Sequence, residues 1–179
     1  MPRYPGLPAA SGNPRRTALY SSSPNARDGR LSIHVSNSTE ETREVARRLT
    51  HSLRPGAVVA LHGILGSGKT TFVKGMAEGL GIEEPVTSPS FALVHEYDAR
   101  VPLYHIDLYR TETTAEVEML DLDPYLFGNG ITVVEWAERA AQLLPDYAVH
   151  VSIEILDSRR RRLRLPDEAP VAGFEENGP

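Results

Sequence analysis

Apolar residues along this chain fall into short blocks, and the spacing within each block separates predicted strands from predicted helices. Two runs, at 57–61 and 131–134, are apolar except for Thr132, contain several β-branched residues and predict strands that are buried on both faces. Further runs that are apolar or that alternate with polar residues predict the other strands, at 31–35, 91–97, 102–106, 149–155 and 162–165. Tight turns at 98–100 and 157–158 should join four of these strands into hairpins.

Helical spacing of the apolar positions marks other segments. Ser38 followed by Glu41 forms a capping-box pattern, and the apolar stripe that follows predicts a helix to about His51. A second helix should begin near residue 69 and end at the glycines around position 80. Residues 114–126 predict one or two short helices, and residues 137–144 predict a last helix that stops at Pro145.

Composition sets the limits of the ordered region. Residues 1–30 are rich in Pro, Ser, Gly and Arg, and we expect them to be a disordered N-terminal extension. Residues 31–165 should form one domain, and residues 166–179 a flexible C-terminal tail. The extension has five arginines against one aspartate, so it carries +4 of a net charge of −5 and the remainder carries −9. The overall field of that remainder would not attract nucleic acid by itself.

Composition also excludes several kinds of protein. The chain has no cysteine, which rules out disulfides, zinc fingers and thiol nucleophiles. No apolar run approaches the roughly 20 residues that a membrane-spanning helix needs. We therefore expect a cytoplasmic protein without membrane association.

The stretch 63–70, GILGSGKT, carries the strongest chemical signal. It matches the phosphate-loop pattern G-x-x-x-x-G-K-[ST] without a gap, and it lies between a predicted buried strand and a predicted helix. Its three glycines permit backbone conformations that a Cβ would block, so that several N–H groups can converge on a polyphosphate. Lys69 would bring positive charge to the β- and γ-phosphates, and the Thr70 hydroxyl would be a hard oxygen ligand for Mg²⁺. The pattern predicts nucleotide binding.

A phosphate loop among alternating strands and helices predicts a P-loop NTPase fold of the α/β class. We expect a three-layer sandwich with a mainly parallel central sheet and additional antiparallel hairpin strands. Ligands of such sheets bind beyond the carboxyl ends of the strands, where Gly63, Asp107 and Glu135 should lie. The two carboxylates either cap the following helices or serve a metal ion, and the phosphate loop favours the metal role for both. One would hold Mg²⁺ through water while the other polarises the attacking water, and the sequence does not order these roles.

Other polar residues have both a functional and a structural interpretation. Thr87 and Ser88 could form a switch loop that senses the γ-phosphate, or only a hydroxyl-rich turn. Arg110 could neutralise charge on the transferred phosphoryl group, or be an ordinary surface arginine. The arginines at 159–162 and 164 could contact RNA phosphates, or form a solvated hairpin face. The six histidines show no metal-ligand spacing, so a structural role is favoured for them.

Four segments together resemble the bacterial TsaE (YjeE) ATPases: GILGSGKTTFV at 63–73, VTSPSF at 86–91, LYHIDLYR at 103–110 and VEW at 134–136. The similarity covers about residues 31–165 and keeps the order and spacing of the family motifs. It implies a small P-loop ATPase that uses ATP, ADP and Mg²⁺ and supports formation of N6-threonylcarbamoyladenosine beside the anticodon of tRNAs that read codons starting with A. The family acts with the TsaD–TsaB heterodimer, so tRNA would be met indirectly, through that complex.

The resemblance also implies a role for individual residues. Mg²⁺ would be held by Thr70 and Glu135, Asp107 would assist hydrolysis, and Trp136 would lie by the nucleotide. Thr87 would belong to the switch loop. Phosphates would be bound by the loop residues Gly63, Leu65, Gly66, Ser67, Gly68, Lys69, Thr70 and Thr71. Where the family usually has Asp, this chain has Ile64, so any contact made by that carboxylate is absent here.

Three other functions remain open at this stage. A GTPase would usually carry an Asn-Lys-x-Asp element, and no asparagine of this chain is followed by lysine. A small-molecule P-loop kinase would need an arginine-bearing lid, for which Arg100 and Arg110 offer little material. A nucleotide-binding scaffold without turnover is the third possibility, and an assay of ATP turnover with and without the TsaD–TsaB pair would separate it from an ATPase.

Overall fold

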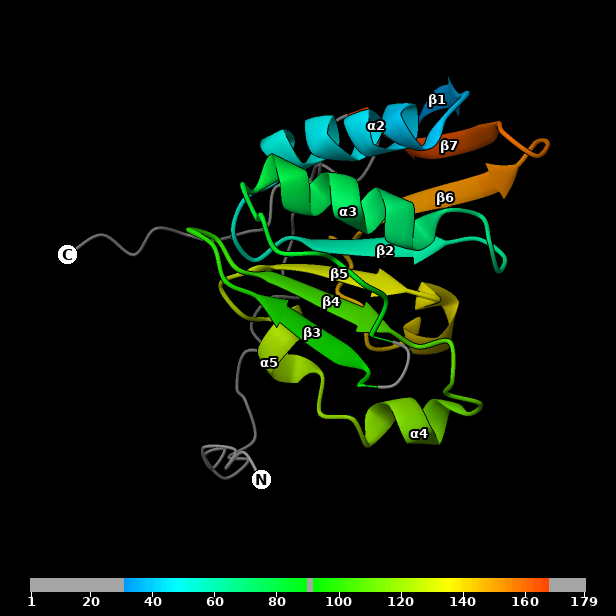
Figure 1. Cartoon of the computed structure of the whole chain (residues 1–179). Helices are drawn as coiled ribbons and strands as arrows, with labels where there is room; N and C mark the ends of the chain where they lie inside the picture. The colour runs from blue at the N-terminus through cyan, green and yellow to red at the C-terminus, as the bar shows by residue number, and fades with distance from the viewer. Residues whose placement is uncertain (1–30, 90–91, 168–179) are drawn as a thin grey trace.

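A computed structural model of the chain describes residues 31–89 and 92–167 (Figure 1). The predicted N-terminal extension and nearly all of the predicted C-terminal tail lie outside these ranges, as do Ser90 and Phe91. Within the described ranges, no helix is long and apolar enough to cross a membrane.

The described residues form a seven-stranded sheet with the strand order β1-β7-β6-β2-β5-β4-β3. Its strands are β1 (Leu31–Ser36), β2 (Val58–His62), β3 (Val94–Tyr97), β4 (Leu103–Asp107), β5 (Ile131–Glu135), β6 (Val149–Ile155) and β7 (Arg161–Pro166). β2 pairs in parallel with both β5 and β6, and β4 pairs in parallel with β5. β3, β7 and β1 are added by antiparallel pairing. The predicted α/β class, parallel centre and two antiparallel hairpins are confirmed.

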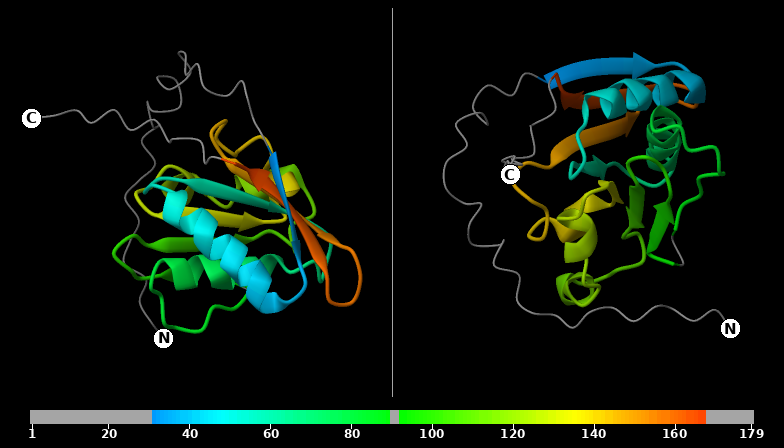
Figure 2. Two further views of the ribbon diagram at one scale, coloured as in Figure 1. Left: turned by 90° about the horizontal axis from the view of Figure 1, so that it is seen from above. Right: turned by 90° about the vertical axis from the view of Figure 1, so that its left-hand side faces the viewer.

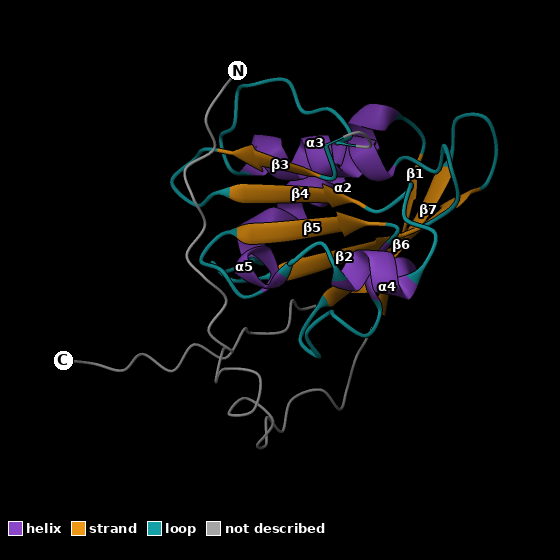
Figure 3. Cartoon of the chain, turned by 90° about the horizontal axis from the view of Figure 1, so that it is seen from below, coloured by secondary structure: helices purple, strands orange, loops and turns teal. Residues whose placement is uncertain are grey.

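Helices cover both faces of the sheet, which gives the three predicted layers (Figures 2 and 3). On one face lie α2 (Thr39–Ser52) and α3 (Lys69–Gly79), and Phe72 and Met76 of α3 pack on Leu61 in a core that water does not reach. The short helices α4 (Thr114–Glu118) and α5 (Asp123–Leu126) and the 3₁₀ helix η1 (Ala137–Ala140) lie on the other face. The two apolar runs predicted to be buried on both faces are β2 and β5, which confirms that interpretation.

The structure shortens two predicted elements. The helix predicted over 137–144 is only the single 3₁₀ turn of η1, which follows the left-handed φ of 58° at Trp136 and ends at Ala140. The chain continues to Pro145 as irregular turns, because so short a segment does not propagate a helix readily. The strand predicted over 91–97 begins only at Val94, because Leu93 has a φ of 67° that breaks the extended backbone.

The predicted capping box at the start of α2 is only half formed. The Ser38 hydroxyl accepts the Glu41 N–H at 3.1 Å, as predicted. The Glu41 carboxylate instead accepts the backbone N–H of Asn37 at 2.7 Å, one residue before the cap. The N-terminus of α2 is therefore capped by Ser38. The Glu41 carboxylate holds the backbone of Asn37, which precedes the cap, and not the backbone of Ser38.

The packing of α3 on α2 positions the helix that begins at the phosphate loop. At Gly75 the two backbones come so close that a Cβ would lie 2.3 Å from the carbonyl oxygen of Arg43. Only glycine allows this approach, because a carbonyl group of a helix cannot move aside cheaply. The contact fixes where the N-terminus of α3 meets the sheet edge.

Candidate functional site

The phosphate loop connects β2 to α3 at the carboxyl end of the parallel strands, as predicted. Gly63, Gly66 and Gly68 have φ values of 148°, 76° and 106°, which residues with a Cβ rarely adopt. A Cβ on Gly63 would also lie 2.5 Å from the carbonyl oxygen of Ile153. Gly68 is the N-cap of α3 and offers no side-chain cap, so the first N–H groups of the helix can serve an anion.

Lys69 is held inside this loop. Its ammonium donates to the carbonyl oxygens of Gly63 at 2.7 Å and Ile64 at 3.2 Å, and it lies 3.9 Å from the ring centroid of Trp136. Burial lowers the pKa of the Lys69 ammonium, and the carboxylates of Glu135, Glu138 and Asp107 oppose that shift. A buried cation surrounded by acids at the loop is suited to neutralising phosphate charge.

Thr70 and Glu135 meet directly, which brings two predicted metal ligands together. The Thr70 hydroxyl donates to Oε1 of Glu135 at 2.8 Å. The buried His105 ring contacts the same carboxylate oxygen through Nε2 at 2.9 Å. A carboxylate only accepts, so Nε2 carries the hydrogen. Nδ1 of His105 is buried and has no hydrogen-bond partner in the described part of the chain.

Asp107 lies beside Glu135, since the two are register partners at the ends of β4 and β5. Its carboxylate accepts the backbone N–H of Tyr109 at 2.9 Å and the hydroxyl of Ser88. Ser88 therefore ties the predicted switch loop to the site. Thr87 itself is exposed, and its backbone N–H and carbonyl oxygen both contact the hydroxyl of Tyr97 at 3.3 Å.

Trp136 lies against the ammonium of Lys69 because the backbone turns sharply after β5. A φ of 58° is rare for a bulky residue and costs on the order of 1–3 kcal/mol, so the surrounding contacts must hold it. The Tyr109 ring lies 5.2 Å from the indole, and the Arg139 guanidinium lies 5.5 Å from it. Arg139 is in turn fixed by the carbonyl oxygens of Leu108, Tyr109 and Thr111. The sequence did not indicate this arginine.

The other loop residues take distinct positions. Ile64 and Leu65 form the loop tip, with 65% and 68% of their surfaces exposed. Ser67 is buried, and its hydroxyl has no hydrogen-bond partner among the described residues. Thr71 is half-buried in the first turn of α3. Ile64 contributes its carbonyl oxygen to Lys69 and to the N–H of Ser67, so these contacts do not need the Asp that the family usually has.

The remaining candidates are exposed or partly exposed. Arg110 is exposed. Of the hairpin arginines, Arg160 pairs with Asp157, and Arg162 and Arg164 share Glu154, which favours the solvated-face interpretation of the run. His62 and His150 contact each other at 2.9 Å, and neither has a hydrogen bond to Thr70, Asp107 or Glu135 among the described residues.

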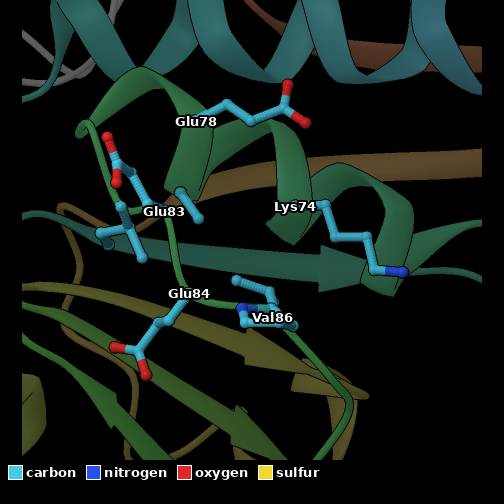
Figure 4. A pocket seen from close by; sticks show the side chains of 8 residues that line it. Lys74, Glu78, Glu83, Glu84 and Val86 are labelled. Carbon is cyan, nitrogen blue, oxygen red and sulfur yellow. The ribbon is translucent and has the colours of Figure 1, made fainter.

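Two surface hollows do not suit a polyphosphate. One, of about 260 Å³, lies between α3 and residues 82–86 and is lined by Glu78, Glu83 and Glu84 with a single ammonium, that of Lys74 (Figure 4). The other, of about 410 Å³, is lined by Glu118, Asp121, Leu122, Asp123 and Leu143. Their negative charge would repel phosphate, so the glycine loop remains the better site.

The oxygen atoms at the loop fit a magnesium ion bound together with phosphate. The hydroxyl of Thr70 and the carboxylates of Glu135 and Asp107 are the hard donors that Mg²⁺ prefers. Residues 31–89 and 92–167 contain no cluster of three or more His, Cys, Asp or Glu side chains that could hold a metal. A cation here would therefore need Thr70 and oxygen atoms of the nucleotide in addition to these carboxylates.

Comparisons with known proteins show the family of this chain. The family model described as "Threonylcarbamoyl adenosine biosynthesis protein TsaE" matches residues 36–163. The tRNA threonylcarbamoyladenosine biosynthesis protein TsaE of Treponema pallidum is 40% identical over 131 residues, which cover 73% of this chain and 97% of that protein. The protein of the same name from Bacillus subtilis is 47% identical over 116 residues, covering 64% and 72%.

A solved structure shares the fold. The crystal structure of YdiB from Bacillus subtilis superposes with a TM-score of 0.67 at 34% sequence identity, over 79% of this chain and 88% of that one. Sequence and structure comparisons thus cover the same domain that carries the phosphate loop. The chain belongs to the TsaE family of tRNA threonylcarbamoyladenosine biosynthesis proteins.

Proposed function

We propose that this chain binds ATP and ADP with Mg²⁺ at the 63–70 loop and hydrolyses ATP in support of N6-threonylcarbamoyladenosine formation. The observation that carries the proposal is the contact between Thr70 and Glu135, which joins the phosphate loop to the end of the neighbouring parallel strand. Family membership supports the pathway, and the geometry of the loop supports the chemistry.

Each residue of the cluster has a defined task under this proposal. The N–H groups of the loop and of the first turn of α3 bind the phosphates, and Lys69 neutralises their charge. Thr70 and Glu135 hold Mg²⁺, which when bound would neutralise charge on the β- and γ-phosphates. Asp107, already a hydrogen-bond acceptor for Ser88, orients or polarises the attacking water. Because Ser88 donates to this carboxylate, a change in the position of Asp107 would move Ser88 and the neighbouring Thr87.

The partner assignment rests on the family. We propose that the chain acts with the TsaD–TsaB pair and meets tRNA only through that complex. The pairing of Arg160 with Asp157, and of Arg162 and Arg164 with Glu154, supports an indirect encounter, because it engages three of the hairpin's five arginines with carboxylates of this chain.

The decisive experiment is an assay of ATP turnover by the full chain, alone and with the TsaD–TsaB pair, with Mg²⁺ and then with EDTA. We expect slow turnover alone, stimulation by the pair and loss in EDTA. Binding of ATP without turnover in any condition would identify a nucleotide-binding scaffold. Turnover that needs a small-molecule acceptor instead of the pair would identify a kinase.

Trp136 provides an independent reporter of binding, because it is the only tryptophan in the chain. Its indole lies on the ammonium of Lys69, so phosphate that attracts this ammonium should change the indole's surroundings. Titration with ADP and Mg²⁺ should give a saturable change in fluorescence that is absent in Lys69→Ala. Binding seen by calorimetry without any change in emission would remove Trp136 from the nucleotide site.

A further inference from the structure

Arg161, the first residue of β7, reaches the phosphate loop from 94 positions away in the sequence. Its guanidinium donates through Nε to the carbonyl oxygen of Ser67 at 3.0 Å and through Nη2 to that of Gly66 at 3.4 Å. Within the 159–162 run, Arg161 is the arginine whose side chain donates to this loop. The side chains of Arg160 and Arg162 donate to Asp157 and Glu154.

We propose that Arg161 is a positioning residue for phosphate binding, one that aims the backbone N–H of Gly68 into the loop; this inference rests on the proposed function. In a trans peptide the carbonyl oxygen and the following N–H point in opposite directions. By holding the oxygen of Ser67 on the outer side of the loop, Arg161 directs the N–H of Gly68 to the inner side. That N–H belongs to the N-cap of α3, where an anion is best received.

The loop needs such an external hold because glycine selects no conformation by itself. A Cβ on Gly66 would meet nothing within 4 Å, and one on Gly68 would meet only Thr71 at 4.0 Å. Packing on the Cβ side of these glycines therefore does little to orient the adjoining peptide planes. Glycine also adopts positive and negative φ with similar ease, so a peptide flip at Ser67 would cost little without a partner for its oxygen.

Arg161 can hold the loop in place because the other side of its guanidinium is bound to the β6–β7 turn. Its Nη1 donates to the carbonyl oxygens of Asp157 at 2.9 Å and Arg160 at 3.0 Å. The turn that presents these oxygens is closed by the Asp157 carboxylate, which accepts the N–H groups of Arg159 and Arg160. These backbone bonds and the Arg160 side chain lower the pKa of Asp157 to about 2, so the carboxylate that closes the turn stays ionised even in mildly acidic solution.

The planar guanidinium matters as much as its charge. It presents donors in fixed directions and here serves four carbonyl oxygens on two segments. A lysine would carry the same charge to this position but could not span the loop and the turn at once. Arg161→Lys therefore separates positioning from simple attraction of phosphate.

The test compares Arg161→Lys and Arg161→Gln with Arg159→Gln, which removes an exposed arginine from the same turn. Calorimetric titration with ADP and Mg²⁺ should show affinity reduced about ten-fold in both Arg161 variants, equivalent to roughly 1.4 kcal/mol. Arg159→Gln should stay within about two-fold of the parent. Melting curves recorded beforehand show whether each variant is folded, and Arg161→Lys decides the question if Arg161→Gln is not.

A second readout does not depend on nucleotide. In ¹⁵N-labelled protein without ligand, the amide signal of Gly68 should shift and its hydrogen exchange should accelerate in both Arg161 variants, but not in Arg159→Gln. Parent-like affinity in Arg161→Lys would overturn the proposal, since charge alone would then suffice. An unchanged Gly68 amide in Arg161→Gln would overturn it as well. If the parent does not bind ADP, the proposed function fails, and the amide signal still decides whether Arg161 orients the loop.

Discussion

The centre of the sheet (β2, β5 and β4, with the start of α3) and its flank (β6, β7 and β1) both carry charged side chains, but the side chains differ in burial. In the centre, Lys69, Asp107 and Glu135 are buried, with 5%, 3% and 3% of their surfaces exposed. In the flank, Arg162 and Arg164 share Glu154 in contact with solvent. An exposed ion pair changes the free energy of folding only slightly, whereas a buried charge lowers stability unless an opposite charge or hydrogen bonds compensate it.

This difference indicates which charged side chains are available to bind a ligand. The buried charges of the centre lie around the loop that would bind a polyphosphate and a cation. The charges of that ligand and cation would balance those of the buried side chains. The flank's ion pairs form at the surface without any ligand. Arg161 is the exception in the flank, because its guanidinium is directed at the loop.

The largest test of this contrast is Lys69→Met, which keeps the length of the side chain and removes its charge. Loss of the ammonium should reduce ATP turnover about 100-fold or more, because phosphate charge would go unneutralised in the transition state. Lys74→Met is the matched control, since Lys74 is exposed on the same helix. Steady-state turnover at saturating ATP checks this. Equal losses in the two variants would mean that total charge, and not the buried position, matters.

Glu135→Gln should have the next largest effect, a loss of roughly 100-fold in Mg²⁺-dependent turnover. The amide keeps the shape of the side chain but is a poorer ligand for a hard cation, and it disturbs the hydrogen bonds from Thr70 and His105. Glu154→Gln in the flank is the control, and it should leave turnover unchanged. Activity measured across a range of Mg²⁺ concentrations distinguishes a weakened metal site from a slower reaction.

Full activity in Glu135→Gln would remove this carboxylate from the mechanism. Asp107, its register partner, would then be the remaining candidate ligand at the strand ends.

Gly75→Ala tests the close contact between α3, which starts at the phosphate loop, and α2, which follows the flank strand β1. This contact joins the centre to the flank. Alanine should gain about 1 kcal/mol in helix propensity, but its Cβ would press on the carbonyl oxygen of Arg43. We expect net destabilisation of roughly 1–3 kcal/mol, measured by denaturant unfolding. Gly79→Ala, whose Cβ would mainly meet the side chain of Thr50, is the control and should cost less. A stabilised Gly75→Ala would show that the helices can separate freely.

The contrast also explains which features the sequence could predict. The loop and its flanking strand and helix are contiguous, and Asp107 and Glu135 could be placed because each follows an apolar strand. Arg139 and Arg161 could not be assigned, because they act on backbone oxygens that lie far away in the sequence. Their residue type alone says nothing about such contacts.

His105 was predictable in part. It lies two positions before Asp107 in β4, and alternate residues of a strand share a face. It therefore had to point toward the same side as a candidate metal ligand. Its contact with Glu135 depends on the pairing of β4 with β5, which the sequence does not reveal.

The smallest expected effect concerns His150, on the flank strand β6. Its ring lies parallel to that of His62, with centroids 5.2 Å apart and a nitrogen-to-nitrogen contact of 2.9 Å. The other nitrogen of His62 faces Glu138 at 3.5 Å. Burial, and then the charge of His62, lower the pKa of His150 below its ordinary value of 6.5.

Because the unfolded chain binds a proton at His150 more readily than the folded one, the folded state should lose stability as pH falls from 7 to 5. The ring is partly exposed, so solvent screening should keep this contribution below about 1 kcal/mol. Urea unfolding at pH 5, 6 and 7 should show a weaker pH dependence in His150→Gln than in the parent. His34→Gln, which removes an exposed histidine from β1, controls for the loss of any histidine. An identical pH dependence in His150→Gln and the parent would show that protonation of His150 does not change the free energy of unfolding.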